Sequence, residues 1–199
     1  NGNLTMVYRA KNGQEATAGL DLDMEDVKVE KLIALFPSID TLVPMLRSFE
    51  GVLDCQVTAT CKMDSTMSLI MPSINSSCYL HGDNMVLLDG ETFTEISKTL
   101  MFKNKKRNMI DSISVDLAIK DNKIEVFPFL VEMDRYKVAV GGTHNLDMTF
   151  NYHLSVLKSP VPFKLGIDIT GNLDDFKYKI TKCKYKDIFK RSEEHTSEL

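Results

Sequence analysis

Three residues in one alternating stretch of the chain carry the side chains of a nucleophile, a base and an acid. Ser155, His153 and Asp147 occupy odd positions between 146 and 156, so on a strand they would share one face. A hydrolytic relay needs a hydrogen bond at each step. Residues two apart on a strand are separated by about 7 Å, and residues six apart by about 20 Å. We therefore expect a solvated polar face here, predict no catalytic residue, and interpret the protein as one that is not an enzyme.

The histidines and cysteines do not have the spacing of a metal site. His81 and His144 lie near predicted turns without an HExxH motif, and the four cysteines lack paired CxxC spacing. The phosphate-binding glycine motifs are missing too, and Gly141 and Gly142 do not stand between a predicted strand and a helix. The sequence therefore predicts no metal, no cofactor, and buried free thiols.

Basic residues gather in two parts of the chain. The groups are Lys103, Lys105, Lys106 and Arg107, and, in strand-like alternation, Lys177, Lys179, Lys182, Lys184 and Lys186. We interpret them as a solvated loop and a protected edge strand, with anionic lipid headgroups as the alternative contact. Nucleic acid is not an expected partner, because the net charge is −4 and the chain has no Trp to stack on bases.

Period-two alternation is the strongest structural pattern in the chain. It is clearest from Leu146 to Val156, where every even position is apolar. We predict a single strand there, about 37 Å long, which favours an extended sheet over a compact sandwich. Similar alternation predicts strands near residues 4–8, 18–22, 53–61, 113–119, 124–126, 136–140, 163–169 and 176–180.

Turn and helix signals complete the predicted fold. Asp121-Asn122-Lys123 predicts a hairpin, Pro128 a bulge or an edge position, and Gly141-Gly142 a turn or bulge before the long strand. Residues 27–48 have helical spacing that Pro37 and Pro44 should split or kink, and residues 91–102 predict a second helix. The fold class is therefore mainly β with two short helical segments, and the short connections favour an antiparallel sheet.

One face of this sheet needs a cover. Burying the six apolar side chains of the Leu146 to Val156 strand is worth roughly 9–18 kcal/mol, at about 1.5–3 kcal/mol each. Leaving this face exposed to water is therefore unfavourable. The predicted helices or a sheet that curls on itself could supply the cover, and so could lipid. The residues alone leave both alternatives open.

The composition and the two ends of the sequence limit the possible interpretations further. The chain has 199 residues, of which 43% are hydrophobic and 26% charged, as in ordinary globular proteins. No run approaches the roughly 18 consecutive apolar residues of a membrane-spanning helix. Because alternation begins at once after Asn1, we expect residues 1–190 to be one region of a longer chain. Residues 191–199 (RSEEHTSEL) read as a translated sequencing adapter and are expected not to be native.

Three longer segments resemble the C-terminal region of AsmA-family envelope proteins, bridge-like lipid carriers related to TamB-type proteins. They are "LFPSIDTLVPMLRSFEGVLDCQV", "LHGDNMVLLDGETFTEISKTLMFKNK" and "IDSISVDLAIKDNKIEVFPFLVEMDRYKVAVGGTHNLDMTFNYHLSVLKSPVPFKLGIDITGNLDDFKYKI". None of them is a catalytic motif, and it is their order over most of the chain that carries the resemblance.

The resemblance implies a curved, open β-groove, shaped like a taco, on the periplasmic side of the Gram-negative cell envelope. Its implied role is non-enzymatic phospholipid transport in outer-membrane biogenesis, with an inner-membrane anchor outside the present sequence. Phospholipid acyl chains would be the partners, with both membranes contacted through other parts of the protein. The groove would be lined by Val115, Leu117, Val138, Val140, Met148, Phe150, Tyr152, Leu154, Leu165 and Ile167. The alternative is a structural or interaction module of an envelope assembly with a dry apolar core and no lipid cargo.

Overall fold

The computed structural model describes residues 16–35, 44–66, 68–88, 107–133, 135–160, 164–172 and 174–189. These residues form ten strands and three short helices. The strands are β1 (Ala16–Lys28), β2 (Phe49–Glu50), β3 (Val52–Met63), β4 (Asn75–Leu88), β5 (Arg107–Lys120), β6 (Lys123–Met133), β7 (Tyr136–Asn145), β8 (Phe150–Lys158), β9 (Leu165–Gly171) and β10 (Phe176–Thr181). The helices are α1 (Val29–Leu35) and the 3₁₀ turns η1 (Pro44–Ser48) and η2 (Met71–Ser73).

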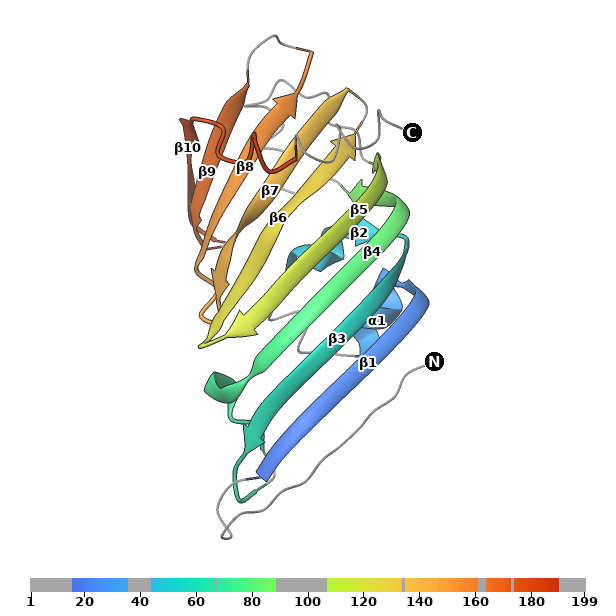
Figure 1. Ribbon diagram of the computed structural model, residues 1–199, viewed down its shortest axis with the longest axis vertical. Helices are drawn as coiled ribbons and strands as arrows, with labels where there is room; N and C mark the ends of the chain where they lie inside the picture. The colour runs from blue at the N-terminus through green and yellow to red at the C-terminus, as the bar shows by residue number, and fades with distance from the viewer. Residues whose placement is uncertain are drawn as a thin grey trace.

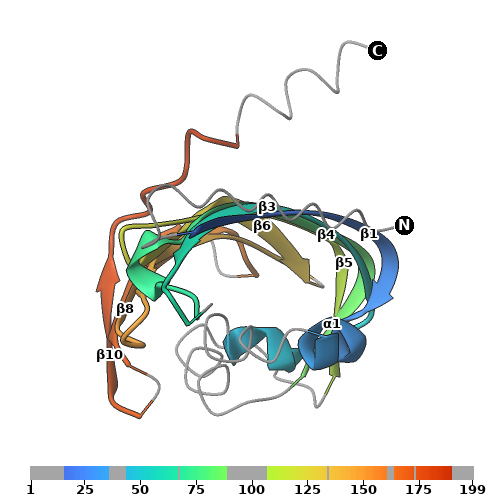
Figure 2. The ribbon, with the colours of Figure 1, turned by 90° about the horizontal axis from the view of Figure 1, so that it is seen from below.

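All ten strands belong to one antiparallel sheet. Its order is β1-β3-β4-β5-β6-β7-β8-β9-β10, with β2 paired to β4, so nearly every strand lies beside its neighbour in the chain (Figure 1). Seen from below, the sheet is an arch, with α1 and η1 inside its hollow and the described segment after β10, residues 182–189, on the convex side (Figure 2). The predicted fold class, an extended, curved and open antiparallel sheet with few helices, is confirmed.

The strand register separates an apolar face from a polar one. Residues paired across an antiparallel ladder share a face. One row of paired residues crosses nine strands: Leu22, Val57, Cys78, Leu117, Val126, Gly142, Tyr152, Ile169 and Tyr178. The next row lies on the other face: Asp21, Thr58, Ser77, Ala118, Glu125, Thr143, Asn151, Thr170 and Lys177. The two faces thus stay separate along these two rows across nine strands, although bulges interrupt the period-two alternation between Met24 and Val27 and between Val126 and Phe129.

The apolar face is the concave one, and helices cover one end of it. Val29 and Leu32 of α1 and Leu46 of η1 pack on side chains from four strands. Those side chains are Leu53, Cys55, Met85, Ile110 and Met133, and Ile110 is fully buried. The predicted helical stretch 27–48 is therefore split as expected into α1 and η1, with Pro44 at the first position of η1.

The prediction of a single strand from Leu146 to Val156 was wrong. Strand β8 begins only at Phe150, and the residues before it form the β7–β8 turn. Asp147 closes this turn because its Oδ1 accepts hydrogen bonds from the backbone N–H of Thr149 at 2.9 Å and from its hydroxyl at 2.6 Å. Met148 has a φ of 71°, a left-handed conformation that regular strand residues do not have.

The predicted turns divide into confirmed and corrected ones. Asp121 and Asn122 have φ values of 52° and 62°, as a two-residue hairpin requires, and connect β5 to β6. A register shift between Val126 and Phe129 confirms the bulge at Pro128. Gly141 and Gly142 make no turn: both lie inside β7, and Gly142 has a φ of 159°.

Some predictions concern residues that the structure does not describe, and one strand was missed. The strand at 4–8, the helix at 91–102 and the basic residues Lys103, Lys105 and Lys106 lie outside the described residues. Strand β4 was not predicted, although it occupies the centre of one half of the sheet. One ladder is short: β5 and β6 pair only from Leu117–Val126 to Lys120–Lys123, next to their hairpin.

Candidate functional site

The concave face brings nine of the ten predicted groove residues onto one surface. Val140 of β7 pairs with Leu154 of β8, which pairs with Ile167 of β9. Val138 and Leu165 flank Val156 in the same way, and Tyr152 and Leu117 lie in the nine-strand apolar row. Val115 and Phe150 occupy the same face two residues along their strands. Met148 is the exception, because it lies in the β7–β8 turn.

Much of this face is only half-buried. Leu117, Val138 and Ile167 are buried. Val57, Cys78 and Leu80 are half-buried against the helix-covered core. Intermediate exposure recurs on the other strands at Leu20, Leu22, Ala59, Val115, Ile119, Val126, Phe129, Val140, Phe150, Tyr152, Leu154 and Leu165. At the β10 edge, Tyr178 is 48% and Ile180 61% exposed. A continuous apolar surface of this extent is unusual for a face that meets only water.

Polar groups on the concave face have the properties of groups in an apolar setting. Burial raises the pKa of the Tyr152 phenol to about 12. Burial also lowers the pKa of His144, against the opposing effect of Asp147. His144 is 4% exposed, its ring lies 6.3 Å from that of Phe150, and its Nε2 has no hydrogen-bond partner. The neutral imidazole is therefore the form that this surface favours.

Two of the four free thiols meet on this face. Cys55 pairs with Leu80 and Cys78 with Val57, so the two cysteines are diagonal neighbours on β3 and β4. A hydrogen bond to Cys55, together with burial, raises the pKa of Cys78 far above that of a free thiol. Only Cys55 is fully buried, and Cys61, Cys78 and Cys183 are half-buried, so the prediction of buried thiols holds for one of the four.

The convex face holds the cluster that the sequence suggested and that strand spacing alone seemed to exclude. His153 Nδ1 donates to Asp168 Oδ1 at 2.6 Å, and Ser155 Oγ lies 2.9 Å from His153 Nε2. The acid is Asp168, directly across the ladder from His153, and not Asp147. His153 is 4% exposed and Ser155 fully buried. The expectation of a solvated polar face was therefore wrong at these two residues: their Cα atoms are separated, but the long imidazole reaches the hydroxyl.

The segment after β10 covers this cluster. The backbone N–H groups of Lys184 and Tyr185 each donate to Ser155 Oγ at 3.0 Å. The Tyr185 ring stands edge-on to His153, with ring centres 5.2 Å apart. Lys184 Nζ lies 2.7 Å from Asp168 Oδ1. Desolvation works to raise the pKa of Asp168, but the hydrogen bonds from Lys184 and His153 outweigh it and lower that pKa.

The same contacts decide what the cluster can do. A hydroxyl has one hydrogen to donate and two lone pairs, and Ser155 uses all three, toward His153, Lys184 and Tyr185. Attack on a substrate needs a free, accessible lone pair on the nucleophile. With the segment in place, the cluster has the hydrogen bonds of a hydrolytic relay, but these bonds hold the chain that follows β10 against the sheet. We name it the Ser155 clasp.

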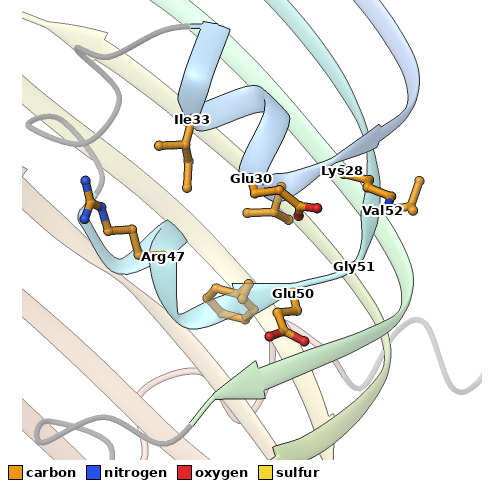
Figure 3. Close-up of a pocket in the computed structure, with 9 residues that line it drawn as sticks. Lys28, Glu30, Ile33, Arg47, Glu50, Gly51 and Val52 are labelled. Atoms are coloured by element: carbon orange, nitrogen blue, oxygen red, sulfur yellow. The ribbon is translucent and has the colours of Figure 1, made fainter.

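A separate pocket of about 660 Å³ opens beside α1 (Figure 3). Its wall combines apolar side chains with two basic and two acidic ones: Lys28, Val29, Glu30, Ile33, Arg47, Phe49, Glu50, Gly51 and Val52. Figure 3 shows Ile33 of α1 and Arg47 of η1 at the left of the view, and Lys28 and Val52 at the right. The pocket is wide open and its charges are mixed, so it lacks the convergent polar groups of an enclosed ligand site.

The described residues lack two further kinds of site. They contain no group of three His, Cys, Asp or Glu side chains that could hold a metal ion. None of their helices is long and apolar enough to cross a bilayer. Comparisons of the chain with models of protein families, with curated proteins and with solved structures find no match.

Proposed function

We propose that the concave face binds the acyl chains of phospholipids, and that the chain is a non-enzymatic groove segment of an AsmA-like envelope protein. The observation that carries the proposal is the apolar row that crosses nine strands in register while much of the surrounding face stays half-exposed. A surface of this kind gains free energy from any apolar molecule that replaces water.

The chemistry of the surface favours an unbranched hydrocarbon chain. Each methylene that leaves water contributes about 0.8 kcal/mol, so a long acyl chain gains enough to hold it in place without any polar recognition. The described concave face supplies a long apolar strip and few hydrogen-bonding side chains, among them Tyr152, His144, Tyr178 and Ser76. Such a surface suits cargo that is recognised by its length and apolarity.

The cellular part of the proposal rests on the resemblance of the three quoted segments. On that basis the groove stands on the periplasmic side of the cell envelope, phospholipid passes along it during outer-membrane biogenesis, and an inner-membrane anchor lies elsewhere in the protein. The curved open sheet is compatible with this role.

A second function has support at one end of the sheet. There the concave side is closed by α1 and η1, and Leu32 and Ile110 are almost completely buried. If the whole face were covered in this manner, the protein would be a structural or interaction module of an envelope assembly with a dry core. The two functions differ in whether lipid touches the strands farther from α1.

Photo-crosslinking separates the lipid-binding function from that of a structural module with a dry core. A photoreactive amino acid at Phe150, on the concave face of β8, should label acyl chains when the full chain is made in cells and its adducts are extracted. The same group at Asn151, an exposed residue on the convex face, is the control. Labelling at Phe150 that greatly exceeds labelling at Asn151 supports the groove. Equal labelling, or none at either position, contradicts it and favours the dry module.

A further inference from the structure

The last strand of the sheet and the segment after it are strongly basic. From Phe176 to Lys186 the sequence contains five of the chain's 24 Lys and Arg residues and none of its 28 Asp and Glu residues. The lysines are Lys177, Lys179, Lys182, Lys184 and Lys186, and all are exposed. We name this surface the basic rim.

The rim has a fixed position in the fold. Lys177 and Lys179 pair with Thr170 and Asp168 of β9, so they belong to the convex face at the β10 edge. Beyond β10 the Ser155 clasp holds the backbone of Lys184 and Tyr185 on β8. Figure 1 shows this last segment crossing in front of β9 and β8. The lysines of the tail are thereby held beside those of the strand.

Protection of a sheet edge does not explain all of these lysines. Lysines on an outer strand discourage pairing with another strand, which accounts for Lys177 and Lys179. The residues from Lys182 onward lie outside β10, on a segment laid across the sheet, where there is no edge to protect. Nearby carboxylates neutralise only part of the charge: Asp168 is engaged by Lys184 and His153, Asp187 follows the rim, and Asp174 and Asp175 lie in the β9–β10 turn.

The same strand also exposes apolar side chains. Tyr178 and Ile180 occupy the concave face of β10, between the lysines in sequence, and Ile180 is among the most exposed apolar residues described. Cations and an aromatic and aliphatic pair along one edge match the two layers of a membrane surface, anionic headgroups and the acyl boundary beneath them.

We propose that the basic rim docks the β10 edge on the surface of an anionic phospholipid bilayer. The charge of the rim selects this partner over a second copy of the chain, because two rims placed edge to edge would bring like charges together. The inference goes beyond the proposed function, since it says which edge of the sheet meets a membrane. Tyr178 and Ile180 then stand where the concave face meets the bilayer.

The test is binding of the full chain to lipid vesicles, measured by co-sedimentation. Binding should be much tighter to vesicles of phosphatidylcholine mixed with phosphatidylglycerol than to phosphatidylcholine alone, and it should weaken as salt rises. Replacing Lys177, Lys179 and Lys182 together by Gln should weaken binding to the mixed vesicles about a hundredfold, since each lysine near such a surface contributes about fivefold.

A matched triple variant controls for net charge. Lys31, Lys120 and Lys123 are exposed and lie away from the rim, so Lys31→Gln, Lys120→Gln and Lys123→Gln together remove the same charge and should leave binding nearly intact. Ile180→Ser should weaken the binding that remains at high salt, whereas Met109→Ser, at an exposed residue of β5, should not.

Three outcomes would overturn the proposal: equal binding to both vesicle types, equal losses in the two triple variants, or rim variants that change self-association in light scattering while vesicle binding stays constant. Failure here is separable from failure of the groove. Crosslinking at Phe150 in the rim variants reports on acyl-chain occupancy independently of docking.

Discussion

His153 and Ser155 extend from the same face of β8, and a hydrogen bond of 2.9 Å joins the Nε2 of the first to the Oγ of the second. The serine hydroxyl accepts two further hydrogen bonds from the backbone of Lys184 and Tyr185. One side chain thus fixes a segment that lies about thirty residues farther along the chain.

Removing that hydroxyl should release the C-terminal segment. Ser155→Ala leaves the backbone N–H of Tyr185 without its acceptor and the N–H of Lys184 with His153 Nε2 alone, at 3.2 Å. A donor left without an acceptor that water cannot reach costs about 1–3 kcal/mol. Hydrogen exchange should therefore accelerate at the amides of Lys184 and Tyr185, with little change in the strands. Thr170→Ala, at an exposed residue of the same face, is the control. Unchanged exchange at Lys184 and Tyr185 would show that the clasp does not hold the segment.

The clasp should not react as a hydrolase nucleophile. Ser155 is fully buried, and both lone pairs of its Oγ accept hydrogen bonds, so an activated phosphonate should leave it unmodified. Intact-mass spectrometry after treatment with a fluorophosphonate measures this directly. A single adduct that disappears in Ser155→Ala would contradict the prediction and support a catalytic role for Ser155.

A charge placed on the concave face should expel lipid. Leu154→Lys puts an ammonium group among Val140, Ile167 and the acyl chains proposed to lie there. The cost of burying that charge should lower co-purified phospholipid roughly tenfold or more. Asn151→Lys makes the same change on the convex face and should retain the lipid. Circular dichroism must show both variants folded; equal lipid content in the two folded variants favours the dry module.

Stability should fall in mild acid because of His144. Its pKa is lowered in the folded protein, so as pH falls below about 6.5 the unfolded chain takes up a proton that the folded chain resists. This contribution to stability is present above that pH and is lost below it, until the folded imidazole is protonated as well. Urea unfolding at neutral pH and near pH 5 measures the loss. His144→Leu should show a smaller loss; an equal loss in both proteins would assign the effect to other groups.

Gly142 should tolerate no side chain. A Cβ at this position would lie 2.3 Å from the carbonyl oxygen of Asn151 and 2.7 Å from the Cα of Tyr152, both backbone atoms of β8. Its φ of 159° adds strain for any other residue. Gly142→Ala should therefore destabilise the protein by at least about 1–3 kcal/mol in urea unfolding. Thr143→Ala, at the next residue, is the control and should cost much less.

Alternation was sufficient to predict much of the concave face. Val140, Leu154 and Ile167 meet there because the side-chain period of a strand is two and short hairpins keep neighbouring strands in phase. The same regularity misled at Asp147 and Met148, whose alternating polarity continues through a turn. Asn145, Asp147 and Thr149 are turn-forming residues and could have located its start.

The clasp could not be predicted in this way. Spacing within one strand says nothing about which residue of the next strand lies opposite, and Asp168 meets His153 only through the β8–β9 register. The cover over Ser155 comes from residues whose alternating lysines predicted an edge strand, whereas β10 ends at Thr181. Strand β4 was missed for a simpler reason: Ser76 and Gly82 interrupt the apolar positions of its concave face.

The short ladder between β5 and β6 gives the arch an uneven stiffness. Only four residue pairs join these two strands, whereas β4 and β5 are paired over most of their length. Bending resistance along a sheet depends on the hydrogen bonds that cross each line between strands. We therefore expect the angle between β1 to β5 and β6 to β10 to change most easily along the line between β5 and β6, away from the end where Met133 of β6 packs with Ile110 of β5.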